Sequence, residues 1–83
     1  MLLQQQGAVM MVPVPVRCRI PEHLRKIGKT QQWLADQTGL GKQRISDYCH
    51  LRYVMNIPTG YMISELLNVY IDDIYEWEWR EQE

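Results

Sequence analysis

Five polar residues near the middle of the chain can hydrogen-bond to another molecule: Lys42, Gln43, Arg44, Ser46 and Asp47. A glutamine amide can pair with N6 and N7 of adenine, and lysine or arginine can donate to O6 and N7 of guanine. An aspartate can accept a bond from the amino group of cytosine. Residue types in this cluster therefore suit contact with the edges of nucleic-acid bases.

Residues on either side of this cluster extend the candidate set. Lys29, Arg52 and Tyr53 can contact phosphates, which fix the position of a protein on a duplex but carry no sequence preference. Asp47 would be repelled by phosphate, so an ion pair with Arg44 or Arg52 is an equally good explanation for it. Each single basic residue is also explained by an ordinary solvated surface charge.

The pattern of residues 29–50 predicts two short helices that would hold this cluster in place. Thr30 is a good N-cap for the first, and Gly39 suits the left-handed turn that ends it. A second helix over about residues 41–49 turns Ile45 and Tyr48, three positions apart, toward the core. A helix-turn-helix has this layout, in which a glycine turn joins two short helices and the second helix has a polar outer face.

One helix is expected before this unit. Pro21 suits a first helical turn, Leu24 and Ile27 are predicted to face inward, and Gly28 ends the helix. His23 has no nucleophile or metal cluster near it in the sequence, so it is expected to be a solvated surface residue.

Two further helices are expected after the unit. Asn56 is the predicted N-cap of one that begins with Ile57 and Pro58 and ends at Asn68. Asp72 and Asp73 are predicted to open a fifth helix, where their charge suits the helix dipole. Its expected apolar contacts are Ile74, Tyr75 and Trp77.

The two ends of the chain leave several interpretations open. Residues 1–16 form an expected N-terminal arm, extended over 12–16 by two prolines. This arm could pack within the chain, contact a second subunit through its valines, or contact DNA through Arg17 and Arg19. Trp77 and Trp79 suit either edge packing or a dimer contact, and residues 78–83 are expected to fray. Trp33 either covers the arm or reaches the DNA backbone.

Composition narrows the class of protein. Eighty-three residues make one small domain. The sequence shows neither a nucleophile with its base, nor paired carboxylates in a plausible pocket, nor a metal-binding set, so neither an enzyme nor a cofactor is expected. The net charge is −1, but residues 1–56 carry +5 and residues 57–83 carry −6. Such asymmetry favours an interaction surface on the basic part. Without an apolar run able to span a bilayer, and with two cysteines interpreted as reduced thiols, we expect a cytoplasmic protein that does not enter the membrane.

Several short motifs, in order and without a gap, resemble the lambda-repressor-like, Cro/XRE-type helix-turn-helix family. They are T-Q-x-x-L-A from Thr30, T-G-L from Thr38, Ile45-Ser46, and I-x-x-x-L-N-V-x-I-D-D-I-Y from Ile63 to Tyr75. The match is closest to a subgroup of Firmicute and phage regulators. Leu51, Cys49 and Tyr70 depart from the residues common in the family.

This resemblance implies a fold and a function. The fold is an all-α, compact five-helix domain over residues 17–77, with the extended arm 1–16 before it and the tail 78–83 after it. Gln31 would contact a phosphate, Lys42 and Gln43 would read base edges with Ser46 and Asp47 one turn on, and the contacts of Arg44 vary. The implied function is a small phage-type repressor that binds double-stranded DNA, with a homodimer needed for a palindromic site. An antirepressor or antitoxin-like module that binds protein through its acidic C-terminal face is the alternative.

Overall fold

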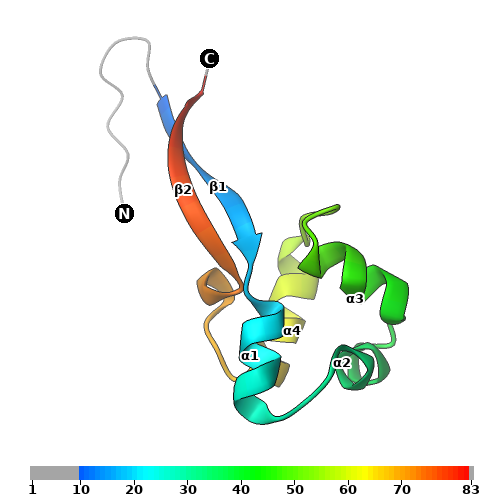
Figure 1. Ribbon diagram of the computed structural model, residues 1–83. Helices are drawn as coiled ribbons and strands as arrows, with labels where there is room; N and C mark the ends of the chain where they lie inside the picture. The colour runs from blue at the N-terminus through cyan, green and yellow to red at the C-terminus, as the bar shows by residue number, and fades with distance from the viewer. Residues whose placement is uncertain (1–9, 83) are drawn as a thin grey trace.

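A computed structural model describes residues 10–82, which form a helical body and a long two-stranded ribbon (Figure 1). Four α-helices, one short 3-10 turn and two antiparallel strands make up this part of the chain. The ribbon projects from the body, and the molecule measures 47 × 22 × 20 Å. The predicted all-α, five-helix fold is therefore wrong, because the last segment forms a strand.

The helical body begins and ends its helices largely where the sequence predicts. Helix α1 spans Ile20–Ile27 and α2 spans Gln31–Thr38, where the Thr30 hydroxyl accepts a bond from the Trp33 N–H at 3.0 Å. Helix α3 spans Lys42–Cys49, and α4 spans Ile57–Leu67. The Asn56 side chain accepts from the Thr59 N–H at 2.9 Å, which confirms the predicted N-cap of α4.

The core lies where the four helices and the base of the ribbon meet. The prediction that Ile27 faces inward is wrong, because Ile27 is 39% exposed. Ile57, at the start of α4, is 74% exposed, whereas Ile71 packs against Gly60 of the same helix. The fully buried side chains include Ile20, Leu34, Ile45, Ile63, Leu67 and Ile74.

Strands β1 (Met10–Cys18) and β2 (Tyr75–Gln82) form the ribbon. Their register pairs Met10 with Gln82 at the tip and Cys18 with Tyr75 at the base, with an irregularity between Pro15 and Arg17. The arm over residues 10–16 thus pairs within the chain, whereas residues 1–9 of the predicted arm lie outside the described part.

The fifth helix that was predicted to start at Asp72 is absent from the described residues. Ile71–Asp73 form only a single 3-10 turn, and Glu78–Gln82, which were expected to fray, continue β2. Aromatic residues at 75, 77 and 79 alternate with charged ones, which is the period of a strand. The prolines of β1 hold it extended beside this segment, so that β2 has a partner for its backbone.

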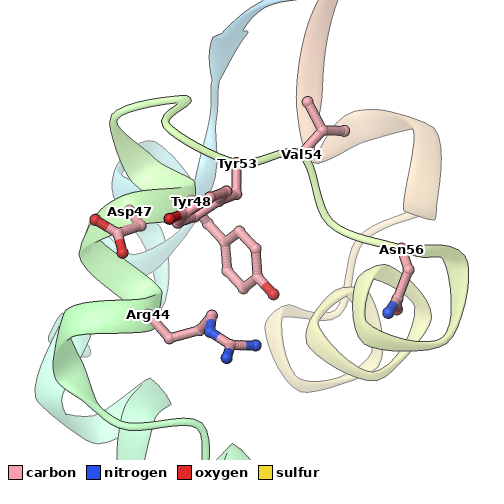
Figure 2. A pocket seen from close by; sticks show the side chains of 6 residues that line it. All are labelled: Arg44, Asp47, Tyr48, Tyr53, Val54 and Asn56. Atoms are coloured by element: carbon pink, nitrogen blue, oxygen red, sulfur yellow. The ribbon is translucent and has the colours of Figure 1, made fainter.

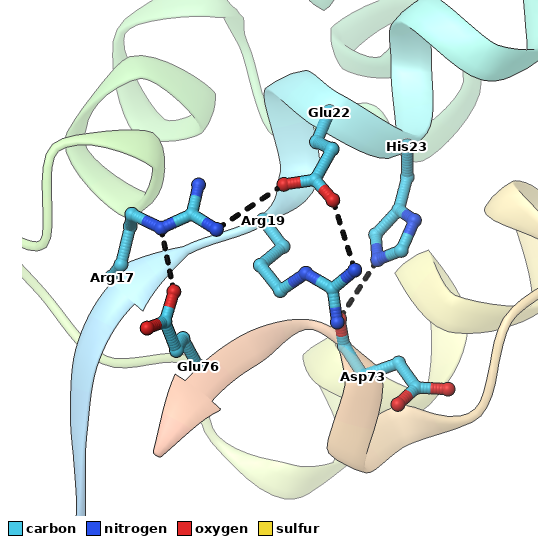
Figure 3. A network of polar contacts seen from close by, with 6 residues as sticks. All are labelled: Arg17, Arg19, Glu22, His23, Asp73 and Glu76. Atoms are coloured by element: carbon cyan, nitrogen blue, oxygen red, sulfur yellow. Dashed lines mark hydrogen bonds and ion pairs between the residues drawn. The ribbon is translucent and has the colours of Figure 1, made fainter. Parts of the chain in front are cut away.

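Ion pairs between arginine and glutamate side chains connect the ribbon to α1 (Figure 3). The Arg17 guanidinium bonds Glu76 at 2.7 Å and Glu22 at 3.3 Å, and Arg19 bonds Glu22 at 2.9 Å. Hydrogen bonding from Arg19, together with the charges of Arg19 and Arg17, lowers the pKa of Glu22 to about 2. One carboxylate therefore joins both arginines next to the base of the ribbon.

His23 is buried, so the prediction of a solvated surface residue is wrong. Its Nε2 atom lies 2.8 Å from the Asp73 carbonyl oxygen, and a carbonyl can only accept, so this nitrogen carries the proton (Figure 3). A backbone bond of 2.7 Å from the Arg19 N–H to the Ile74 carbonyl runs alongside. The histidine is thus a structural link between α1 and the 3-10 turn.

Candidate nucleic-acid interface

The outer face of α3 carries the candidate base-contacting residues. Ile45 and Tyr48 are buried and hold the helix against the core, while Lys42, Gln43 and Arg44 in its first turn are exposed. Gly41 precedes the helix with φ 86° and ψ 152°, a conformation that is open essentially to glycine alone. The turn after α2 therefore uses a second glycine, besides Gly39, to set where α3 begins.

Asp47 joins two other candidate residues. Its Oδ1 atom accepts a hydrogen bond from Gln43 Nε2 at 3.0 Å and another from the Arg52 guanidinium at 3.0 Å. The ion pair expected as one of the explanations for Asp47 is therefore present, with Arg52 as the partner. This carboxylate orients the Gln43 amide and draws Arg52 back toward α3.

Ser46 lies one turn along α3 and is half-buried. The His50 Nδ1 atom lies 2.8 Å from the Ser46 carbonyl oxygen and 3.4 Å from its hydroxyl. The same carbonyl also accepts the His50 backbone N–H at 3.0 Å, so the ring nitrogen adds a second contact at the end of α3. Sequence reasoning missed this role of His50, although a histidine four residues after a serine at a helix end is a suitable signal.

Lys29 and Gln31 flank the start of α2. Lys29 is exposed, and its Nζ atom lies 5.4 Å from the centre of the Trp33 ring, within the range of a cation–π contact. Gln31 is the first residue of α2 and is half-buried. Trp33 packs against the core and carries Lys29 over its face, so it positions a candidate phosphate contact.

An open cavity of about 480 Å³ separates α3 from the segment that leads into α4 (Figure 2). Figure 2 shows the Arg44 guanidinium pointing into this space, while Tyr53 lies on the connecting loop. Tyr53 is 61% exposed. The structure thus brings Arg44, Asp47 and Tyr53 to one hollow. Val54 and Asn56 also line it, which no pattern in the sequence indicated.

The two cysteines meet where β1 and α3 end. Both are free thiols, and a side-chain hydrogen bond between them affects the pKa of each. This bond and burial raise the pKa of Cys49, while the same bond lowers the pKa of Cys18. The contact packs the last turn of α3 against the base of the ribbon.

Two other kinds of functional element are absent from residues 10–82. This part of the chain contains no group of three or more His, Cys, Asp or Glu side chains placed to hold a metal ion. None of its helices is long and apolar enough to cross a membrane.

Two proteins of Bacillus subtilis strain 168 are similar to this chain. The SPbeta prophage-derived uncharacterized HTH-type transcriptional regulator YopS is 40% identical over 63 residues, which cover 75% of this chain and 85% of that protein. A second, the SPbeta prophage-derived uncharacterized HTH-type transcriptional regulator YotL, is 32% identical over 69 residues, covering 82% and 86%. The chain belongs to this family of prophage helix-turn-helix regulators.

Membership of the family confirms the resemblance to a phage-type helix-turn-helix regulator. No protein-family model and no solved structure matches the chain, so the narrower Cro/XRE assignment stays a prediction. In this chain, the helix-turn-helix unit is α2 and α3, with the turn at Gly39 and Gly41 between them. The residues predicted from the sequence lie on that unit and on the two loops that flank it.

Proposed function

We propose that this protein is a sequence-specific repressor that binds double-stranded DNA and places α3 in the major groove. The observation that carries the proposal is the first turn of α3, where three long polar side chains, Lys42, Gln43 and Arg44, are exposed above the buried Ile45 and Tyr48. A short helix whose inner face is packed against the core and whose outer face is polar fits a major groove. The similar prophage proteins are named transcriptional regulators, which supports the same function here.

Gln43 is the proposed base reader whose geometry is best defined. Asp47 takes one hydrogen from Nε2, which leaves the second hydrogen and Oε1 for a base. A glutamine with these two groups available can bond N7 and N6 of adenine together. Asp47 is therefore a positioning residue for Gln43, and Lys42 at the tip of the same turn contacts an adjacent base.

Contacts with DNA phosphates are proposed for residues on either side of the first turn of α3. Lys29, held over Trp33, and Gln31, in the first turn of α2, lie on one side of the recognition helix. Arg44 and Tyr53 lie around the open cavity on the other side, with Arg52 beside them in its ion pair to Asp47. Contacts of this kind on both flanks would fix the position of α3 on the duplex.

A repressor that blocks transcription by occupying its DNA site needs only to bind that site. We therefore propose neither a catalytic step nor a cofactor. The protein would act in the cytoplasm, where its DNA lies. A palindromic site would require a homodimer that places two copies of α3 about one turn of DNA apart.

A binding selection from random-sequence DNA, followed by mobility-shift titrations at several salt concentrations, tests the proposal. The selected site should bind more tightly than random DNA, with an affinity that falls as salt rises. Gln43→Ala should weaken the selected site about 10- to 100-fold and leave random DNA nearly unchanged, whereas Lys29→Ala should weaken both alike.

Gln37→Ala is the matched control, because Gln37 is an exposed glutamine on α2 outside the candidate set. It should bind both DNAs like the unaltered protein. Equal loss on both DNAs for Gln43→Ala would remove Gln43 as a base reader. Absence of any DNA binding at low salt would instead favour the protein-binding alternative.

A further inference from the structure

The outer edge of β2 is open. In an antiparallel ladder, successive residues point their backbone N–H and C=O groups alternately toward and away from the partner strand. Pro13 and Pro15 have no N–H, so an intact ladder requires that they face away from β2. Their partners Trp79 and Trp77 must then also direct their backbone groups outward, and Glu81 follows in the same alternation.

The two edges of the ribbon therefore differ. The edge of β1 carries two prolines, which cannot donate to a further strand. The edge of β2 offers N–H and C=O groups at three alternate positions, and among residues 10–82 no other backbone group bonds to them. Such an edge is a template for strand pairing, and a sheet of only two strands gains stability from additional ones.

We propose that β2 pairs antiparallel with β2 of a second copy of this chain. The product is a four-stranded sheet in the order β1-β2-β2-β1, with a twofold axis through Trp79. Both outer edges of that sheet are then the proline-bearing β1 strands, so that assembly stops at two copies. The inference goes beyond DNA binding and does not depend on it.

Charge selects the position of the axis. With Trp79 opposite the partner's Trp79, Glu78 lies opposite the partner's Arg80, and Arg80 lies opposite the partner's Glu78. If the axis passes through Glu78, Arg80 or Glu81 instead, that charged residue lies opposite its own copy. If the axis passes through Trp77, Glu76 lies opposite the partner's Glu78. Like charges in directly opposed positions destabilise a sheet. Among registers centred on residues 76–81, only the one centred on Trp79 avoids such pairs.

An apolar face accompanies this edge. Residues that pair across strands share a face, so Trp77 and Trp79 lie on the same side as Pro15 and Pro13. The two tryptophans are 41% and 45% exposed, and Trp77, Trp79, Pro13 and Asp72 line an open hollow of about 330 Å³. Pairing brings each Trp79 beside its copy and covers part of this apolar surface.

The same strand is a poor surface for a polyanion. Glu76, Glu78 and Glu81 outnumber Arg80 on β2, and Arg17 of β1 is already paired with Glu76 and Glu22. A nucleic acid would be repelled from this edge, whereas a second copy supplies both signs of charge in matching positions.

Sedimentation of the full chain without DNA tests the proposal over a micromolar to millimolar range. We expect a monomer–dimer equilibrium in the micromolar range, as befits a small interface. Glu81→Pro removes an outward N–H without disturbing the pairing with β1, and should weaken the dimer at least tenfold. Glu81→Ala keeps that N–H and is the matched control, expected to dimerise like the unaltered chain.

A charge-exchange experiment tests the register. Glu78→Arg alone places two arginines opposite each other, and Arg80→Glu alone places two glutamates opposite each other, so each variant should dimerise about tenfold more weakly. An equimolar mixture of the two should form a heterodimer about as readily as the unaltered chain. Circular dichroism of each variant confirms that it is folded.

Three results would overturn the proposal. A chain that stays monomeric throughout the concentration range excludes this dimer. Equal dimerisation of Glu81→Pro and Glu81→Ala excludes pairing through the β2 edge, and no gain on mixing the two charge variants excludes the Trp79-centred register. None of these outcomes depends on DNA, so a failure of dimerisation is distinguishable from a failure of DNA binding.

Discussion

The helical body and the ribbon present opposite surfaces. The exposed turn of α3 carries Lys42, Gln43 and Arg44, whereas β2 carries three glutamates and two half-exposed tryptophans. The net charge of −1 is small because the basic part and the acidic part of the chain nearly cancel, so it characterises neither surface. The proposed recognition of DNA and the proposed pairing with a second copy therefore lie on separate elements of one small regulator.

The two regions meet at Tyr75, the first residue of β2. Its hydroxyl accepts a hydrogen bond of 3.1 Å from the Met55 N–H, in the loop between α3 and α4. Its ring packs edge-on against Trp77, with 5.7 Å between the ring centres. One side chain thus connects the ribbon to the loop that follows α3.

Removal of this connection should have the largest effect on stability. Tyr75→Ala should lower the free energy of unfolding by about 3–5 kcal/mol, because a buried aromatic ring is lost. Tyr75→Phe keeps the ring but leaves the Met55 N–H without its acceptor, which costs about 1–3 kcal/mol. Urea unfolding measures both. A Phe variant as stable as the unaltered protein would show that the hydroxyl does not join the two regions.

A change confined to the helical body should have a smaller effect. Gly41→Ala should cost about 1–3 kcal/mol, because alanine is strained at φ 86° and ψ 152°. Gly39→Ala, at φ 72° and ψ 10°, is the matched control and should cost only about 1 kcal/mol. Thermal unfolding separates the two. Equal costs would mean that the start of α3 adapts without strain, and the ribbon should be unaffected in either case.

The smallest expected effect lies in the exposed ion pairs that fasten the ribbon to α1. The pKa of Glu22 is lowered from 4.5 to about 2, so this carboxylate contributes stability above its unfolded-state pKa and loses it as the pH falls toward 2. Glu22→Gln should therefore melt slightly below the unaltered protein at neutral pH, and the difference should vanish in acid. Melting temperatures measured from neutral pH down to acid check this. A difference that stays constant over the whole series would exclude charge as its cause.

The sequence predicts the helical body well because its signals are local. Thr30 and Asn56 cap the helices that follow them, and Gly39 and Asn68 end helices in left-handed conformations, as predicted. Each of these signals acts within a few residues of the chain. Lys42, Gln43 and Arg44 are exposed on α3, as the pattern of that helix predicts, while their contacts with DNA stay a prediction.

The ribbon could not be predicted in the same way. Residues from Ile74 to Trp77 also suit a short helix when considered alone, and the partner that stabilises the strand, β1, lies far upstream. The alternation of Tyr75, Trp77 and Trp79 is a local signal for the strand, but the resemblance to a helical family predicts a helix at the same residues. His23 was misplaced for a related reason, since its acceptor on Asp73 is 50 positions away.

The register of the ribbon also bears on how the chain folds. Arg17 and Glu76, which pair near its base, are 59 positions apart in the sequence. Contacts between such distant residues form late, because a long loop must close before they stabilise anything. During synthesis, β1 leaves the ribosome well before its partner strand is made. The helical body can therefore form first, and the β2 edge that we propose for pairing forms only after residues 75–82 have been made.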